Sequence, residues 1–260
     1  MIPEGSRISK GIPIQNLLSL EKGERIMSII PIDNYDDNHF LFFATRNGTV
    51  KRTAIKEFES IRRNGKIAIS LREGDQLLDV KHTDGNTEIL LATNKGKLCR
   101  FTETQARPLG RASMGVKGID TAGAPVIGFS TSLEGSYVLA ITQHGYGKMS
   151  PIEEYRQTKR GAKGVLTLNT TQKNGKLVCL RAVNGNEDLM MVTSNGTVIR
   201  IPLEQVKVSG RNTQGVRVIR LEDEKQKVSS ITVVPHEDEI EGEAVNEEAA
   251  PEVVEEKPAE

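Results

Sequence analysis

The sequence predicts an all-β fold: a propeller-like β-pinwheel of about five four-stranded blades, followed by a disordered acidic C-terminal tail. Three observations predict this fold: a unit of about 50 residues recurs, its apolar residues alternate with a period of two, and no segment has the 3.6-residue period of a long helix. Of the 260 residues, 37% are hydrophobic but only 4% are aromatic, and Trp is absent. This composition suits several small aliphatic layers, which stacked repeats provide, better than one large core.

The first half of each unit is predicted to be a β-hairpin. Each unit opens with an apolar run that ends in Thr, and Gly follows three residues later, as in LFFATRNGTVKR, ILLATNKGKLCR, VLAITQHGYGKM and LMMVTSNGTVIR. The glycines Gly48, Gly96, Gly145 and Gly196 are 48, 49 and 51 residues apart. The apolar run suits a buried strand, and the glycine supplies the positive φ that a tight turn needs. The next strand alternates apolar and basic residues, so one of its faces is predicted to face water.

The second half of each unit is predicted to add two more strands. It holds a basic, glycine-containing connection, a polar turn and a last apolar strand such as VSSITVV. Within a β-pinwheel domain over residues 1–235, the complete repeats are expected at about 40–84, 88–133, 137–184 and 188–234. Residues 6–33 match only the second half of the unit, so the chain holds four repeats and a half. Strands of this half-repeat lack partners within the sequence, which predicts either an open ring or a fragment of a longer protein. We favour the fragment.

The formal net charge is zero, but the charges are segregated along the chain. Residues 236–260 contain 11 Asp/Glu and one Lys, which leaves 34 Lys/Arg against 24 Asp/Glu in residues 1–235, a net charge of +10. The acidic segment has too few large apolar groups to offset the entropy of ordering it, so it is predicted to be a disordered tail. The basic body points to a polyanionic partner.

The sequence predicts a cytoplasmic protein without a membrane partner. No apolar run is long enough to span a membrane, and the N-terminal residues lack the apolar core of a signal peptide. Cys99 and Cys179 are isolated within apolar, strand-like runs. They are therefore expected to be buried thiols and not part of a disulfide framework.

Signals of catalysis are absent, so no catalytic residue, metal site, cofactor or small-molecule substrate is predicted. The four histidines are scattered, and none has a Cys, His or acidic neighbour at metal-ligand spacing. The segments GRASMGVKG and GRNTQGVR lack the Lys-Ser/Thr pair that a phosphate-binding P-loop carries after its second glycine. The tyrosines are expected to pack or to lie in turns, since none has a base nearby in the sequence. The chain alone is therefore predicted not to be an enzyme.

Basic residues recur at fixed places in the unit, mostly in the connection between its two halves. Those assigned to phosphate contact are Arg7, Lys10, Arg62, Arg63, Lys66, Arg107, Arg111, Lys117, Arg156, Lys159, Arg160, Lys163, Arg211 and Arg217. Because repeats stack with a regular rotation, one basic loop per unit predicts a basic track along the rim. Duplex DNA fits such a track, because it carries about one charge per 1.7 Å of its axis. A curved basic rim favours bending of the duplex, since added phosphate contacts offset the elastic energy.

Other functions stay open on these residues alone. A protein-interaction β-propeller without a nucleic-acid role would favour exposed aromatic residues and Met, and this chain is poor in aromatic residues. An enzyme with its site in the central channel would need converging carboxylates or histidines, which the sequence does not show. Taken singly, each basic residue fits an ordinary solvated loop, but the repeated register favours phosphate binding. The scarcity of aromatic residues argues against single-stranded nucleic acid.

Long segments of the chain resemble one known family. From Ser6 to Val234 the chain resembles the C-terminal DNA-wrapping domain of the DNA gyrase A subunit, and less closely that of the topoisomerase IV A subunit. The most specific segments are GIPIQNLLSLEKGERI, FATRNGTVKRTAIKEF, ITQHGYGKMSPIEEYRQTKRGAKGV and VSGRNTQGVRVIRL. The resemblance implies a β-pinwheel, usually of six blades, that wraps duplex DNA in a positive sense. An acidic tail that tempers DNA binding also occurs in the family, and the segment after Pro235 is similar to one.

The resemblance also implies partners and a role within a larger enzyme. The partners would be duplex DNA, the remainder of the gyrase A subunit, and the gyrase B subunit, in a nucleoid-associated, ATP-dependent enzyme that supercoils DNA negatively. The family's signature loop, Gln-Arg-Arg-Gly-Gly-Lys-Gly in the first blade, is absent, and its nearest relative here is Lys159–Gly164 in a later blade. The cleavage domain with its DNA-attacking tyrosine and the ATPase domains are also absent. The resemblance therefore implies a non-catalytic module that lacks the first blade.

Overall fold

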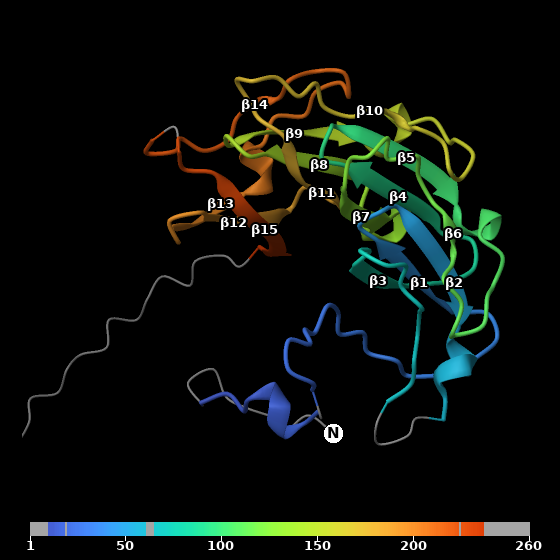
Figure 1. Ribbon diagram of the computed structural model, residues 1–260. Coiled ribbons are helices and arrows are strands. Elements are labelled where there is room, and N and C mark those ends of the chain that lie inside the picture. Colours follow the sequence, from blue (N-terminus) through green and yellow to red (C-terminus); the bar gives the residue numbers. More distant parts are fainter. Residues whose placement is uncertain (1–9, 19, 61–64, 224, 237–260) are drawn as a thin grey trace, which may run out of the picture.

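The computed structural model describes residues 10–18, 20–60, 65–223 and 225–236, which form four antiparallel β-sheets arranged along an arc (Figure 1). Each sheet is built around one hairpin of the repeat. In spatial order, the first sheet contains β3 (Leu77–Thr83), β1 (Phe40–Thr45), β2 (Thr49–Ala54) and β6 (Val116–Lys117). The second sheet contains β10 (Val165–Leu166), β5 (Lys97–Thr102), β4 (Glu88–Thr93) and β7 (Val126–Thr131).

The third and fourth sheets follow the same plan. The third contains β11 (Leu177–Val183), β8 (Tyr137–Thr142), β9 (Tyr146–Pro151) and β14 (Val216–Arg217). The fourth has three strands, β13 (Val198–Pro202), β12 (Glu187–Thr193) and β15 (Val228–Pro235). The helices are short 3-10 turns, η1 (Ile14–Asn16), η2 (Ile55–Phe58), η3 (Glu103–Gln105), η4 (Ser132–Glu134), η5 (Ile152–Glu154) and η6 (Leu203–Gln205). No helix in the described part of the chain is long and apolar enough to cross a membrane. The predicted all-β propeller class is confirmed.

The Thr-x-x-Gly signature forms the turn of each hairpin, as the first repeat shows. The N–H of Gly48 donates to the carbonyl oxygen of Thr45 at 3.0 Å, and the N–H of Thr49 donates to Oγ1 of Thr45 at 3.1 Å. Gly48 has φ +82°, and a Cβ there would lie 2.8 Å from Cγ2 of Thr121. The turn therefore needs glycine both for its backbone angle and for the close approach of the next repeat.

The outermost strand of each four-stranded sheet comes from the following repeat. β6 pairs with β2, with Thr49 opposite Lys117 and Val50 opposite Val116. β10 pairs with β5, and β14 pairs with β9, in the same way. The chain entering β6 lies very close to β2. A Cβ on Gly115, whose φ is +90°, would lie 2.4 Å from the carbonyl oxygen of Val50. Consecutive sheets are thus joined by strand exchange as well as by packing.

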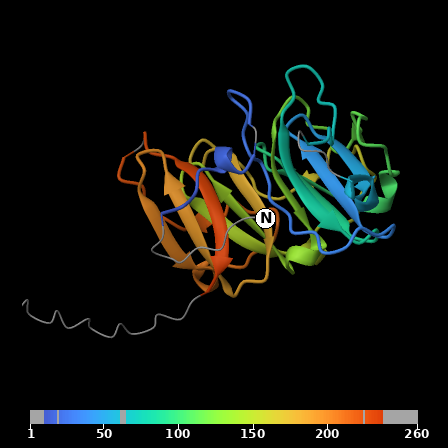
Figure 2. The same cartoon turned by 90° about the horizontal axis from the view of Figure 1, so that it is seen from below.

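The N-terminal half-repeat builds no sheet of its own. Over the described residues 10–18 and 20–39 it forms only η1, and its extended segment runs between the first and the last sheet (Figure 2). Ile30 and Ile32 pack against the buried Leu41, Phe43 and Phe58 at the outer flank of the first sheet. The described residues therefore form four sheets where about five blades are predicted, because no hairpin lies beside the half-repeat to pair with it.

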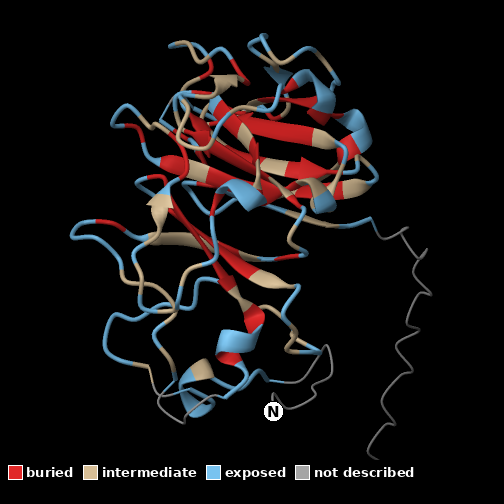
Figure 3. Cartoon of the chain, turned by 90° about the vertical axis from the view of Figure 1, so that its right-hand side faces the viewer, coloured by how far each residue is buried: buried red, intermediate tan, exposed pale blue. Residues whose placement is uncertain are grey.

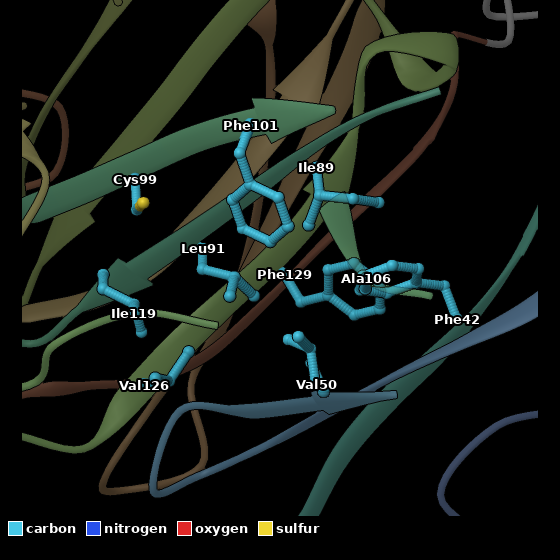
Figure 4. Close-up of a cluster of buried hydrophobic side chains, with 11 residues drawn as sticks. Phe42, Val50, Ile89, Leu91, Cys99, Phe101, Ala106, Ile119, Val126 and Phe129 are labelled. Atoms are coloured by element: carbon cyan, nitrogen blue, oxygen red, sulfur yellow. The ribbon is translucent and has the colours of Figure 1, made fainter. Parts of the chain in front are cut away.

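The core is divided among successive layers between sheets, as the aliphatic composition predicts. Phe42 of β1, Leu91 of β4 and Phe129 of β7 meet between the first two sheets (Figure 4). Leu90, which precedes Leu91 in β4, points to the other face of the strand and packs with Tyr155 between the second and third sheets. The central strands β1, β4 and β8 are accordingly buried on both faces, while much of the connecting chain is exposed (Figure 3). Cys99 and Cys179 are buried free thiols, as predicted.

Candidate nucleic-acid interface

The basic connections lie side by side on the outer side of the arc, next to β6, β10 and β14 (Figure 1). We call residues 65–72, 107–121, 156–170 and 207–221 together the linker band. One main-chain hydrogen bond recurs at each of its three junctions. The N–H groups of Ser70, Asp120 and Asn169 donate to the carbonyl oxygens of Ser113, Ala162 and Thr213, at 3.1, 2.9 and 3.0 Å. Each donor follows its linker's glycine by five residues, and each acceptor precedes the next linker's glycine by two. The band is therefore one continuous surface with the period of the repeat.

Two of the predicted arginines also hold neighbouring linkers together. Nη1 of Arg160 donates to the carbonyl oxygen of Lys117, and its Nε donates to that of Gln105 at 3.0 Å. Nη1 of Arg211 donates to the carbonyl oxygen of Leu166 at 3.1 Å. Lys117 and Leu166 are equivalent positions of successive repeats. A guanidinium has five N–H groups, so both arginines retain donors for a phosphate while they fix the linker beneath them.

Carboxylates touch the linker band at four places, one of them Glu88, which accepts a hydrogen bond from Nε2 of Gln157. Asp120 lies 3.3 Å from Nζ of Lys117, and the hydrogen bond from this ammonium lowers the pKa of the Asp120 carboxyl. Glu57 lies 3.8 Å from Nε of Arg111. Glu154 accepts the backbone N–H of Arg211 at 2.7 Å. Asp120 is the only acidic residue within the band itself, so the band keeps its cationic character.

Four further predicted cations on the band form no ion pair within the described residues. Arg107, Arg156, Lys159 and Lys163 are exposed on the band, and none of them forms an ion pair with a carboxylate in the described part of the chain. Lys10 is exposed too, and it belongs to the half-repeat and not to the band. Arg7, Arg62 and Arg63 lie outside the described residues. Free, exposed cations are the groups that can meet a phosphate without first breaking an ion pair.

A hollow lies where the first and second linkers meet. Lys66 and Arg111 line it with Glu57, Gly110 and Ser113. Nζ of Lys66 donates to the carbonyl oxygen of Glu57 at 3.3 Å, which holds this side chain at the edge of the hollow. Two cations on the wall of a concave polar surface suit a phosphate group.

The strand after the turn departs from the sequence prediction in the first and third repeats. Its basic residues are predicted to face water, but Lys51, Arg52 and Lys148 are buried beneath the linker of the following repeat. Nζ of Lys51 donates to the carbonyl oxygens of Ala68, at 2.6 Å, and of Arg111, and Nζ of Lys148 donates to that of Gly210 at 2.6 Å. Sequence reasoning missed these residues because strand exchange covers a face that a lone hairpin would expose.

Tyr146 at the start of β9 is a second residue that sequence reasoning did not assign to the site. Nη2 of Arg217 donates to its hydroxyl oxygen at 3.2 Å, and Nζ of Lys173 lies 5.7 Å from its ring centroid. The hydrogen bond from Arg217 lowers the pKa of the Tyr146 hydroxyl. The cross-strand pairing of Arg217 with Tyr146 is what brings the two together. In the described residues no group of three His, Cys, Asp or Glu side chains could hold a metal ion.

Comparison with known proteins matches this chain to one family over most of its length. A family model described as the DNA gyrase C-terminal domain, a β-propeller, matches residues 1–33, 39–84, 87–128, 136–184 and 187–235. The chain is 48% identical over 233 residues to the DNA gyrase A subunit of Ureaplasma parvum serovar 3, covering 89% of the chain and 28% of that relative. It is 45% identical over 246 residues to the DNA gyrase A subunit of Staphylococcus aureus strain MRSA252, covering 93% and 28%. The chain thus spans little more than a quarter of these relatives.

Two solved structures share the fold. A C-terminal domain of DNA topoisomerase IV superposes with a TM-score of 0.80 and 26% identity, covering 86% of this chain and 71% of that one. A DNA gyrase A C-terminal domain superposes with a TM-score of 0.74 and 23% identity, covering 87% and 76%. At 23% identity, the likeness to the gyrase A domain concerns the fold alone.

Proposed function

The chain belongs to the family of DNA gyrase C-terminal domains, and we propose that it is a non-catalytic module that binds duplex DNA along the linker band and bends it. The observation that carries this proposal is the hydrogen bond that recurs between consecutive linkers. Because each linker is fixed to the next, its cations form one curved row and not separate patches. A curved row of cations favours a bent duplex, since the added phosphate contacts offset the elastic energy of bending.

The candidate contacts divide by their surroundings. Arg107, Arg156, Lys159 and Lys163 are exposed and unpaired among the described residues, so we propose them as the primary phosphate contacts. Lys66, Lys117, Arg111, Arg160, Arg211 and Arg217 already bond to the protein and would contribute through their remaining donors. Lys10, Arg7, Arg62 and Arg63 would extend the row at its N-terminal end.

We propose further that the module acts within a larger enzyme. By analogy with its relatives, the partners are the remainder of the gyrase A subunit, and the gyrase B subunit, in the cytoplasm. Wrapped DNA would be presented there for ATP-dependent strand passage, with the cleavage and ATPase chemistry supplied by the other domains. The relatives are named as A subunits of DNA gyrase, which gives no support to the alternative of a protein-interaction propeller without a nucleic-acid role.

A salt titration of duplex binding tests the proposed function. If the protein contacts six to ten phosphates of the duplex, its affinity is expected to fall roughly 10³–10⁵-fold between 50 and 200 mM salt. End-to-end fluorescence transfer on a doubly labelled duplex should rise on binding, because bending brings the ends together. Affinity that is insensitive to salt, or a duplex that stays straight, would contradict the proposal.

A pair of matched variants locates the interface. The double change Lys159→Gln and Lys163→Gln removes two exposed cations from the band and should reduce the salt dependence by about two phosphate contacts. Lys176→Gln removes an exposed cation outside the band, next to β11 at the opposite edge of the third sheet from β14, and should leave binding unchanged. Equal effects of the two variants would show that the charge acts non-specifically and that the band is not the binding surface.

A further inference from the structure

Two buried lysines occupy the same position in the first and third repeats. Lys51 of β2 and Lys148 of β9 both have 0% exposed surface. Their ammonium groups bond to main-chain carbonyl oxygens, and neither forms an ion pair with a carboxylate in the described part of the chain. Burying an ammonium group without a counter-charge is unfavourable. Nζ of Lys51 also lies 5.6 Å from the ring centroid of Phe43, but no aromatic ring contacts the ammonium of Lys148 in this way within the described residues, so packing does not explain a lysine at both positions.

The fold does not require a lysine at this position. The equivalent residue is Cys99 in the second repeat and Ile199 in the fourth. Cys99 is fully buried within its sheet, and Ile199 packs against the core between the third and fourth sheets. The repeat thus accommodates apolar side chains of two sizes at the place where Lys51 and Lys148 are found.

Both lysines bind the linker turn of the following repeat from beneath. Lys51 reaches the carbonyl oxygen of Arg111, and Lys148 reaches that of Gly210, the residue before Arg211. These turns form one wall of the linker band. By contrast, Sγ of Cys99 lies 3.8 Å from the carbonyl oxygen of Lys159, so the turn of that repeat receives a weak hydrogen bond from a thiol. Where lysine is present, the turn is held by a charged donor.

We propose that Lys51 and Lys148 are positioning residues for DNA binding, which fix the turns that carry Arg111 and Arg211 and place a positive charge beneath the phosphate path. The proposal rests on the proposed function of the linker band. In this arrangement the lysines do not touch the DNA. They act through the arginines above them, and their charge attracts the phosphates through a short layer of protein in which screening by water is weak.

The charge on these lysines is expected to respond to pH near neutrality. Burial, and to a smaller extent Arg111, lowers the pKa of Lys51 to about 8. Burial also lowers the pKa of Lys148 to about 8, with Glu154 acting against this shift and Arg211 adding to it. A phosphate above either lysine favours its ammonium form and so raises its pKa. DNA binding should accordingly take up protons, and affinity should fall as pH rises through about 8.

The test compares the full chain with Lys51→Ile, Lys148→Ile and the double variant, which copy the residue found at position 199. Binding of a duplex is measured from pH 6.5 to 9.0 at constant ionic strength, and thermal unfolding is followed in parallel. At pH 7 the double variant should bind at least roughly tenfold more weakly than the wild type, with an unchanged or higher Tm. Its affinity should stay flat between pH 7 and 9, where the wild type weakens, because ordinary lysines titrate near 10.4.

The possible results separate the two proposals. A double variant with the affinity and pH profile of the wild type would overturn the positioning role and leave the band's function standing. Weaker binding that appears only together with a lower Tm would also overturn it, since the lysines would then be structural. A wild type without salt-dependent duplex binding would overturn the proposed function itself.

Discussion

Arg211 donates through Nη1 to the carbonyl oxygen of Leu166, and this bond joins the linker of the fourth repeat to that of the third. The same bond joins Arg160 to Lys117 one repeat earlier. These arginines face outward among the predicted DNA contacts, yet they also tie each linker to its neighbour. Structural and DNA-binding effects therefore coincide at these two positions, and variants must be chosen to separate them.

Arg211→Ala and Arg156→Ala should differ in one measurable respect. Arg211→Ala removes a hydrogen bond between linkers and should lower the free energy of unfolding by about 1 kcal/mol as well as weaken DNA binding. Arg156 is exposed and free of ion pairs among the described residues, so Arg156→Ala should weaken binding alone. Denaturant unfolding and duplex titration of both variants check this, and an equal loss of stability in Arg156→Ala would contradict it.

The strand exchange should depend on Gly115. An alanine there would adopt φ +90° and place its Cβ 2.4 Å from the carbonyl oxygen of Val50. Gly115→Ala should therefore destabilise the fold by about 2–4 kcal/mol. Gly110→Ala serves as the control, since a Cβ at Gly110 meets nothing within 4 Å. Thermal unfolding of the two variants checks the prediction, which fails if Gly115→Ala unfolds like the wild type.

Tyr146 should report on Arg217 through its titration. The hydrogen bond from Arg217 lowers the pKa of the Tyr146 hydroxyl by favouring the phenolate. Arg217→Ala should shift this titration to higher pH, observable by NMR of ¹³C-labelled tyrosine. Tyr155 is buried and its hydroxyl bonds to Oγ1 of Thr167 at 2.6 Å, so its signal provides an internal reference that should not move. An unchanged Tyr146 titration would show that the two side chains do not interact.

The two cysteines should resist alkylation in the folded protein. Burial raises the pKa of the Cys99 thiol, and it raises that of Cys179 to about 11. The reactive thiolate is therefore scarce at pH 8, and the sulfur atoms are covered. Mass spectrometry after iodoacetamide treatment should detect little modification in buffer and complete modification in denaturant. Rapid labelling of the native protein would count against the buried position of these strands.

Deletion of residues 237–260 should tighten duplex binding. All 11 Asp/Glu of the C-terminal segment lie in this range and can compete for the cations of the linker band. The gain should shrink as salt rises, because the competition is electrostatic. Duplex titrations of the full chain and the shortened chain at two salt concentrations measure it. Equal or weaker binding after deletion would show that the segment does not compete with DNA.

Local chemistry made part of this structure predictable from the sequence. The turn from Thr45 to Gly48 depends on residues a few positions apart, and its repetition revealed the hairpins and the propeller class. The pairing of Val116 with Val50 depends on residues 66 positions apart and involves a strand of only two residues, too short to leave a pattern. The burial of Lys51 follows from that pairing, so it escaped prediction with it. The band itself was foreseeable as a periodicity of charge, but the bond from Ser70 to Ser113 that makes it continuous was not.

The exchange of outer strands also sets the order in which the sheets are completed during synthesis. The first hairpin ends at Ala54, but its sheet gains its fourth strand only when residues 116 and 117 have left the ribosome. The second and third hairpins wait in the same way for the unit translated after them. A nascent chain would thus always carry one unfinished edge near the exit tunnel, and a cut in any connection would damage the unit upstream of it.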